Sequence, residues 1–139
     1  MVEATALLCM ALTIWTESRG EPFKGQVAVA SVVMNRVAKN NSSVCGEITK
    51  PYQFPWAKDK IKKKHNDYYV HEKAMPRGEV WEKSMELAAA VLDGTQKLVP
   101  RITSFHNVDE FPKWKLRKEF ALGRHIFYSY YDTPAKRNA

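Results

Sequence analysis

Cysteine and long apolar runs are both scarce in this sequence, and their scarcity excludes several classes of protein. The 139 residues include two cysteines, Cys9 and Cys45. Two cysteines do not make a disulfide scaffold, and Cys9 lies among apolar residues. The favoured interpretation is therefore two buried free thiols, with one intramolecular bridge left open. The apolar run from Ala4 to Trp15 is too short to cross a bilayer as a helix, so we expect no membrane insertion.

The same run does not resemble a signal peptide. No basic segment precedes it, Glu3 stands at its start, and cleavage after it would remove or expose the turn around Glu17. We interpret it as a helix of the core and expect that the chain carries no export signal of its own. Because no internal repeat or low-complexity tract is present either, we expect residues 1–139 to form a single domain, and we expect a monomer.

Several kinds of catalytic site are also missing. There is no glycine-rich phosphate loop. Ser-His-Asp chemistry stays open, although no serine stands in the sharp turn typical of a nucleophile elbow. Neither a helical His-x-x-x-His pair nor the His/Cys spacing of a zinc site is found among the four histidines: His65, His71, His106 and His125. We therefore expect neither a metal nor a cofactor.

Positive charge is what the sequence has in excess. Lysine and arginine number 22 against 15 aspartate and glutamate, which gives a net charge of +7 and indicates an anionic partner. Basic residues surround Trp114 between Lys113 and Lys118, a mixture that single-stranded nucleic acids favour. However, no helix-turn-helix, zinc finger or RNA-recognition motif accompanies it. A non-catalytic basic module that binds cell wall or nucleic acid remains the alternative from another class.

Periodicity predicts an α+β fold, mainly α, with a small antiparallel β-ribbon. Helices are expected over about 3–18, 24–39 and 79–93, and a short helical piece capped by serines 42 and 43 is expected through 48. The second helix carries enough small and apolar residues to be buried on more than one face. Residues 50–56 are expected to be extended because of two prolines, 58–65 to be a solvated basic helix face, and 102–107 and 125–130 to be paired strands.

Glu17 lies on the last turn of the first predicted helix, where packed core meets an irregular turn. Gly20 permits a left-handed turn, and Pro22 cannot continue the helix. On a helical wheel, Glu17 falls at the edge of a buried stripe made of Leu7, Met10, Ala11, Ile14 and Ser18. Partial burial there would raise the pKa of the carboxyl group, as a general acid requires. An ordinary surface glutamate at a helix end is the alternative.

An ordered set of motifs resembles the cell wall hydrolases of the spore-cortex-lytic type, which also occur as phage endolysins. The specific part is Ile14 to Pro22 (I-W-T-E-S-R-G-E-P), followed by G-Q-V-A-V-A from Gly25 and N-R-V from Asn35. Later pieces agree in order and spacing: Gln53-Phe54-Pro55-Trp56, Phe105-His106-Asn107, Pro112-Lys113-Trp114 and Leu122 to Tyr128. Two departures are Pro55, where the family often has serine, and residues 101–104, where it usually has Gly-Ala.

The resemblance implies a lysozyme-like fold related to lytic transglycosylases and cleavage of the MurNAc–GlcNAc β-1,4 bond of peptidoglycan. The family's catalytic acid falls on Glu17. Because an export signal is missing, the endolysin branch fits better: the protein would be made in the host cytoplasm and act on the cell wall after release by a separate membrane protein. Peptidoglycan glycan strands are then the expected partner, and no nucleic acid is expected.

Glycoside cleavage usually needs a second carboxylate. Glu21, Asp109 and Glu110 are candidates by position, although Glu21 can be structural, paired with Arg19 or a backbone amide, and the other two can be a solvated surface pair. Without a second carboxylate, Glu17 would act as acid and then as base, and the muramoyl 6-hydroxyl would give a 1,6-anhydro product. We prefer this lytic transglycosylase scheme over hydrolysis by water, the muramidase alternative.

The substrate cleft is expected to be lined by amide and aromatic side chains. Amides would bond the N-acetyl groups of the sugars, and aromatic faces would stack on pyranose rings. For Asn35 two roles stay open: binding of substrate in the cleft, and a structural amide in a packed helix. The predicted substrate-binding residues are Gln53, Phe54, His106, Asn107, Tyr128 and Asn35.

Overall fold

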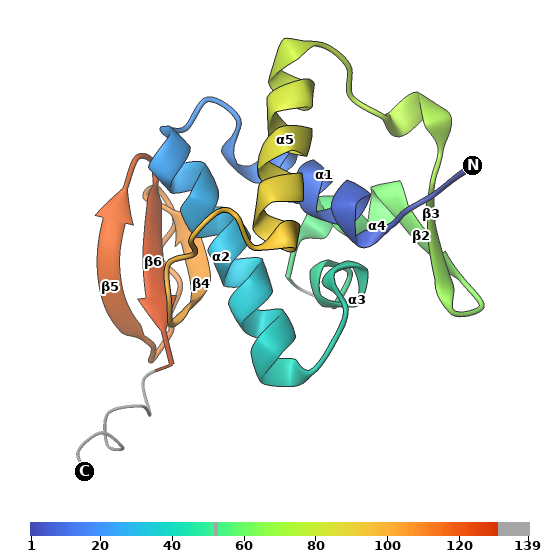
Figure 1. Cartoon of the computed structure of the whole chain (residues 1–139). Helices are drawn as coiled ribbons and strands as arrows, with labels where there is room; N and C mark the ends of the chain where they lie inside the picture. Colours follow the sequence, from blue (N-terminus) through green and yellow to red (C-terminus); the bar gives the residue numbers. More distant parts are fainter. Residues whose placement is uncertain (52, 131–139) are drawn as a thin grey trace.

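The computed structural model describes residues 1–51 and 53–130. Figure 1 shows α1, α2 and α5 in the middle of the molecule, one sheet beside α2 and a small hairpin on the opposite side. The predicted class, α+β and mainly α, is confirmed. In chain order the elements are β1 (Val2–Glu3), α1 (Ala6–Ser18), α2 (Phe23–Asn40), α3 (Val44–Ile48), α4 (Pro55–Lys60), β2 (Ile61–Lys64), β3 (Asp67–Val70), the 3-10 turn η1 (Glu72–Ala74), α5 (Glu79–Asp93), β4 (Ile102–Asn107), β5 (Arg117–Leu122) and β6 (His125–Ser129).

Helix α1 is the buried centre of the helical part. Thr5 caps it, because its hydroxyl oxygen accepts a hydrogen bond from the amide of Leu8 at 3.3 Å. The helix begins at Ala6 and not at Glu3, because Val2 and Glu3 pair with β3. Its middle turns are fully buried and pack against α5, α2 and α3. The carboxyl end of α1, which carries Glu17, is therefore held by a rigid core.

Helix α2 is buried on two faces, as its small and apolar residues predict. One face joins α1 in the main core through Val27, Ala30 and Val33. The other face packs on the sheet, where Val29 and its neighbours meet Phe127 in a second cluster. This helix thus joins the helical core to the sheet (Figure 1).

Cys9 and Cys45 form a disulfide bond, so the expectation of two free thiols is wrong. The bond joins α1 to α3, with the two Cα atoms 5.4 Å apart. Ser43 caps α3 as expected by accepting from the amide of Gly46, and α3 packs on α1. Burial of Cys9 among apolar residues is equally compatible with a thiol and a disulfide. What decides between them is the packing of two segments separated by 36 residues, which local sequence does not reveal.

The segment between residues 50 and 65 differs from its prediction in three places. Where extended chain was expected before Phe54, a turn is found, in which the Gln53 amide donates to the carbonyl oxygen of Lys50 at 3.3 Å. The chain is extended at Phe54, but Pro55 begins α4, because proline is well tolerated in the first turn of a helix. Helix α4 ends at Lys60, and Ile61–Lys64 form strand β2 where a basic helix face was expected. The buried side chain of Ile61 anchors this strand, and its lysines are exposed. Tyr52 lies outside the described residues.

Strands β4 and β6 pair antiparallel, which confirms the predicted ribbon. An unpredicted strand, β5, pairs with the other edge of β6 and completes a three-stranded sheet in the order β4-β6-β5. A second small sheet, β1-β3-β2, was not predicted either. The bounds of α5 match the expected 79–93, and Gly94 ends the helix with a φ of 86°.

None of the helices in residues 1–51 and 53–130 combines the length and the apolar content that crossing a membrane would require.

Candidate functional site

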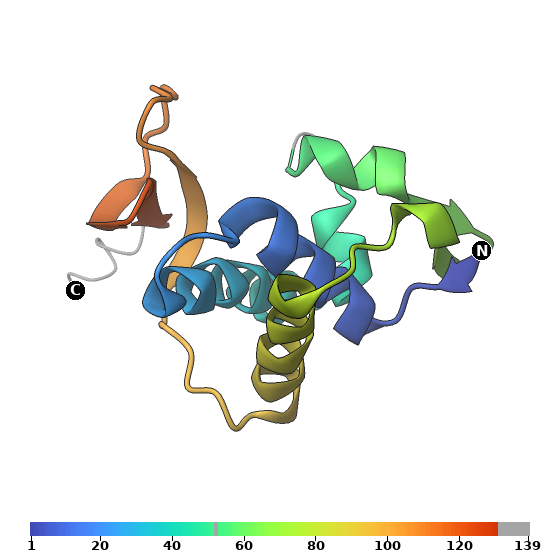
Figure 2. The same cartoon turned by 90° about the horizontal axis from the view of Figure 1, so that it is seen from above.

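A cavity of about 590 Å³, here called the Glu17 pocket, opens where four segments meet. These are the end of α1, the later part of α2, the start of α4 with the two residues before it, and the stretch from the end of β4 into the loop that follows it. In Figure 2 the β4–β5 loop and α4 rise on the same side of the molecule, with the end of α1 between them. The pocket is lined by Glu17, Arg36, Gln53, Phe54, Pro55, Phe105, His106, Asn107, Glu110, Phe111, Pro112 and Trp114.

Glu17 is half-buried, and its carboxyl group has one strong hydrogen bond. The indole Nε1 of Trp56 donates to Oε2 at 2.9 Å. Burial raises the pKa of Glu17 above its ordinary value, because a charged group loses hydration in the pocket. The Trp56 bond acts in the opposite direction, and the nearby charge of Glu110 raises the pKa further. The balance favours a carboxyl group that holds a proton at higher pH than usual.

His106 is fixed on the pocket wall by both ring nitrogens. Nδ1 lies 2.6 Å from the carbonyl oxygen of Asn107, and Nε2 lies 2.8 Å from the hydroxyl oxygen of Tyr128. Because a carbonyl oxygen only accepts, Nδ1 donates, and in the neutral ring Nε2 accepts from Tyr128. Trp114 meets both rings edge-on, at 5.4 and 5.2 Å between centroids. Tyr128 does not line the pocket; it supports His106 from behind.

The three candidate second carboxylates lie in different surroundings. Glu110 lines the Glu17 pocket and accepts from the backbone amide of Asn107 at 3.1 Å. Asp109 is 67% exposed outside the pocket and pairs with Arg124 at 3.3 Å. Among these three, therefore, Glu110 alone shares the cavity with Glu17.

Glu21 has a structural environment outside the pocket. It accepts from the backbone amide of Arg124 at 2.9 Å, which ties the turn after α1 to the β5–β6 turn. A Cβ atom at Gly123 would collide with Oε1 of Glu21 in this position, so the approach favours glycine, whose φ is 60°. The alternative that Glu21 pairs with a backbone amide matches this geometry.

Asn35 also lies outside the Glu17 pocket, so the structure does not support it as a cleft residue. Its amide nitrogen donates to the carbonyl oxygens of Val99 at 3.0 Å and Ile102 at 2.9 Å. It thereby fastens the start of β4 to α2. The local sequence of a packed helix does not distinguish a structural amide from a ligand-binding amide. The distinction depends on the hydrogen-bond partners of Asn35, which lie more than 60 residues away in the sequence.

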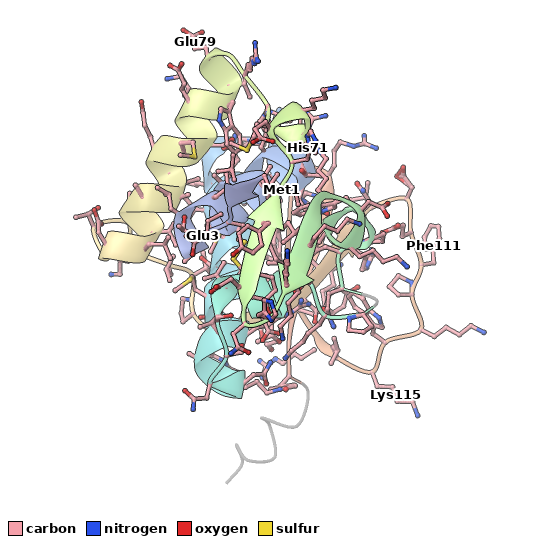
Figure 3. All side chains as sticks on the ribbon, turned by 90° about the vertical axis from the view of Figure 1, so that its right-hand side faces the viewer. Met1, Glu3, His71, Glu79, Phe111 and Lys115 are labelled. Carbon is pink, nitrogen blue, oxygen red and sulfur yellow. A yellow bond between two sulfur atoms is a disulfide. The ribbon has the colours of Figure 1, made fainter. Side chains whose placement is uncertain are left out.

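Several lining residues were not predicted as site residues: Arg36, Pro55, Phe105, Phe111, Pro112 and Trp114. Trp56, the partner of Glu17, was not singled out either. The sequence signal that could have found them is the aromatic content of the β4–β5 loop, which holds Phe111 and Trp114. In the structure Phe111 is 88% exposed. Figure 3 shows Phe111 and Lys115 at the outer edge of this loop, with side chains pointing away from the body. A large exposed aromatic ring at the rim of a cavity suits contact with a flat ligand surface.

Across the part of the chain that the structure describes, no three His, Cys, Asp or Glu side chains gather in a way that would hold a metal ion. His106 and His125 are not opposite each other on the sheet, because His106 pairs with Ile126 and His125 with Asn107.

Comparison with known proteins gives the family. Residues 20–128 match the family model described as Cell Wall Hydrolase. This chain belongs to the cell wall hydrolase family. The matched segment includes the described pocket residues on α4, β4 and the following loop, and it begins three residues after Glu17.

Relatives of this cell wall hydrolase include spore cortex-lytic enzymes. One from Oceanobacillus iheyensis is 30% identical over 126 residues, which are 85% of this chain and 39% of that protein. One from Bacillus cereus is 49% identical over 47 residues, 32% of this chain and 18% of that protein. The chain thus spans well under half the length of these relatives. The crystal structure of the catalytic domain of the Bacillus cereus SleB protein matches with a TM-score of 0.62 and 30% identity, covering 89% of each chain.

Proposed function

We propose that this chain is a peptidoglycan-degrading glycosidase that cleaves the MurNAc–GlcNAc β-1,4 bond. The observation that carries the proposal is the half-buried Glu17, whose pKa is raised by burial inside a pocket of about 590 Å³. A carboxylic acid whose pKa is raised keeps its proton to higher pH and can deliver it to the glycosidic oxygen. Membership of the cell wall hydrolase family and similarity to spore cortex-lytic enzymes support peptidoglycan as the substrate.

Glu17 would act first as general acid. Its proton goes to the leaving oxygen while the bond to the anomeric carbon breaks through an oxocarbenium-like transition state. The Trp56 indole holds one carboxyl oxygen at 2.9 Å, which leaves the other oxygen to face the substrate. Once deprotonated, the same carboxylate accepts a proton from the attacking nucleophile.

For the second step we propose the lytic transglycosylase route. The muramoyl 6-hydroxyl attacks the anomeric carbon and loses its proton to Glu17, which yields a 1,6-anhydro sugar. This route requires one carboxylate. The competing muramidase route, in which water attacks, has a specific observation in its favour: Glu110 lines the same pocket and has an electrostatic effect on Glu17.

The sugars would be held by the polar and aromatic walls of the pocket. Gln53 and Asn107 offer amides for N-acetyl groups, Phe111 offers an exposed ring face and His106 offers an oriented imidazole. Phe54 also lines the pocket, but it is 6% exposed and belongs mainly to the core. The net charge of +7 would hold the protein on the anionic wall. In this proposal residues 1–139 form one catalytic domain of the endolysin kind. It would work as a monomer without metal and act on the bacterial wall after release from the host cytoplasm.

The test is mass spectrometry of soluble products from purified peptidoglycan, with wild type, Glu17→Gln and the exposed control Glu86→Gln in parallel. Anhydro-muropeptides from wild type and the control, but not from Glu17→Gln, would support the transglycosylase. Reducing muramic acid ends would identify a muramidase. If Glu17→Gln released the same products as wild type, the assignment of the acid would be wrong. If no variant released product but all bound the wall, a binding module would be the better description.

A further inference from the structure

A second hollow of about 340 Å³, here called the Arg36 chamber, adjoins the Glu17 pocket. The two share three lining residues: Arg36, Gln53 and Trp114. The shared wall makes them neighbouring compartments of one groove. A ligand held by Glu17 in the first compartment can therefore extend a substituent into the second.

Arg36 presents a desolvated cation at this shared wall. Its Nε donates to the carbonyl oxygen of Thr103 at 2.6 Å, which fixes the plane of the guanidinium group. Its Nη1 is buried and has no hydrogen-bond partner among residues 1–51 and 53–130. Burial lowers the pKa of Arg36, yet an arginine remains charged at neutral pH. A fixed, partly dehydrated guanidinium group with one nitrogen left without an acceptor favours an anionic partner such as a carboxylate.

The remaining charged residues of the chamber give it a positive balance. Lys39 and Lys50 also line it, and Glu47 is the one acid among its described lining residues. The Glu47 carboxylate is already used within the protein, since it accepts from Lys50 at 3.0 Å and from Asn40 at 3.2 Å. The Lys39 ammonium lies 3.4 Å from the centre of the Tyr130 ring. The chamber thus suits an anionic group better than a neutral sugar.

We propose that the Arg36 chamber binds a free carboxylate of the peptide stem carried by the muramic acid residue at the cleaved bond, with Arg36 as its main donor. This inference rests on the proposed function, because it assumes that the bond beside muramic acid lies at Glu17. It makes the enzyme selective for stem-bearing strands over bare glycan.

The chemistry of peptidoglycan places such a group within reach. The stem is joined to the lactyl group of the same sugar ring whose glycosidic bond is cut, and free carboxylates begin at the second stem residue. Two residues extend at most about 7 Å. A stem that leaves the Glu17 pocket past the shared wall therefore brings its first carboxylate into the chamber.

The experiment compares two substrates made from one preparation: intact strands, and the same strands freed of stems by an amidase. Because the amidase leaves a free lactyl carboxylate on each muramic acid, this group is capped as its methylamide in the second substrate. kcat/KM is measured on each for wild type, Arg36→Gln, Arg36→Lys and Arg77→Gln. Arg77 is exposed outside both compartments, so its variant is matched for lost charge. Wild type and Arg77→Gln should favour stem-bearing strands by about tenfold or more, the worth of one hydrogen bond to a charged group. Arg36→Gln should bring the ratio close to one, and Arg36→Lys should retain part of it.

Equal rates of wild type on both substrates would overturn the chamber proposal and leave the proposed function intact. A wild type that cleaves neither substrate would overturn the proposed function instead. In that case, and also if Arg36→Gln fails to fold, a binding measurement tests whether the Arg36 chamber binds the stem carboxylate. The Arg36 Nε–H signal of the Glu17→Gln protein is followed by NMR during titration with a disaccharide-tripeptide or with the bare disaccharide whose lactyl carboxyl group is capped as the methylamide. A shift with the first and not the second supports the chamber, and no difference between them overturns it.

Discussion

The indole nitrogen of Trp56 donates a 2.9 Å hydrogen bond to the carboxylate of Glu17, and this contact joins α4 to the end of α1. Three influences therefore set the acidity of Glu17. Burial is the largest and raises the pKa, the Trp56 bond lowers it, and the charge of Glu110 raises it. Each of the two side chains can be changed separately, so the balance is open to direct measurement.

Trp56→Phe should move the pKa of Glu17 upward. The substitution removes a donor that favours the ionised carboxylate and keeps an aromatic ring in place. The alkaline limb of the pH profile of kcat/KM should shift to higher pH, because the acid form persists further. The loss of orientation should also lower kcat by roughly 10–100-fold. An alkaline limb that stays in place would show that the indole bond does not influence the acid.

Glu110→Gln should move the same limb in the opposite direction. Removing a neighbouring negative charge makes ionisation of Glu17 easier, so its pKa falls. If Glu110 acts only through its charge, the product remains 1,6-anhydro muropeptide, and its yield at low pH is preserved. If water-derived products dominate in wild type and disappear in this variant, Glu110 is the second carboxylate of a muramidase.

Glu17 should also lower stability at neutral pH, and the sign follows from its raised pKa. The folded state binds the proton more tightly than the unfolded chain, so the stabilising contribution is full below the unfolded pKa and is lost as pH rises through the folded pKa. Glu17→Gln, which cannot ionise, should therefore melt at a higher temperature than wild type at pH 8. The difference should vanish at pH 4. Equal melting temperatures at both pH values would contradict a raised pKa.

The sequence predicted most of the helical core and the position of Glu17, but less of the site around it. Periodic burial is a local signal, which is why α2 and α5 were found close to their true bounds. The partners of Glu17 come from elsewhere in the chain: Trp56 lies 39 residues away, on a helix that was expected to be extended chain. Gln53, Phe54, His106 and Asn107 were found through ordered motifs, and the structure brings them together.

Asn35 and Glu21 show why the remaining roles were not predictable. Both are polar residues within or beside a family motif, and both bond backbone groups at least 64 residues away. Residue type and spacing are the same for a structural bond and a catalytic one. Only the fold, which brings β4 and the β5–β6 turn to these side chains, separates the two.

Glu21→Gln should keep both activity and product type. The amide oxygen of glutamine can still accept from the backbone amide of Arg124, so the connection to the β5–β6 turn survives. Glu21→Ala should instead lower the free energy of unfolding by about 0.5–1.5 kcal/mol, the net contribution of one hydrogen bond, since water can replace the acceptor at this exposed amide. Urea unfolding and product analysis of the two variants test both statements. Loss of cleavage by a fully folded Glu21→Gln would restore Glu21 as a second carboxylate.

The Cys9–Cys45 bond should stabilise the fold without taking part in catalysis. It closes a loop with a sequence separation of 36 residues, and a bridge of this kind stabilises a small domain by about 2–4 kcal/mol. Urea unfolding should therefore show a lower midpoint after reduction, whereas the Cys9→Ala/Cys45→Ala double variant should resemble the reduced protein and not respond to reductant. Two thiols that react in native, unreduced protein would contradict the bridge.

Cleavage by the reduced enzyme, measured well below its melting temperature, should remain close to that of the oxidised enzyme. Cys9 lies about 12 Å along α1 from Glu17 at 1.5 Å per residue, and fully buried Met10, Leu12 and Ile14 lie between them. This packing holds the end of the helix independently of the bridge, and the Trp56 bond fixes the carboxyl group itself. Reduction should thus change how much protein is folded and leave kcat of the folded fraction unchanged. A lower kcat of the folded, reduced enzyme would mean that the bridge positions Glu17.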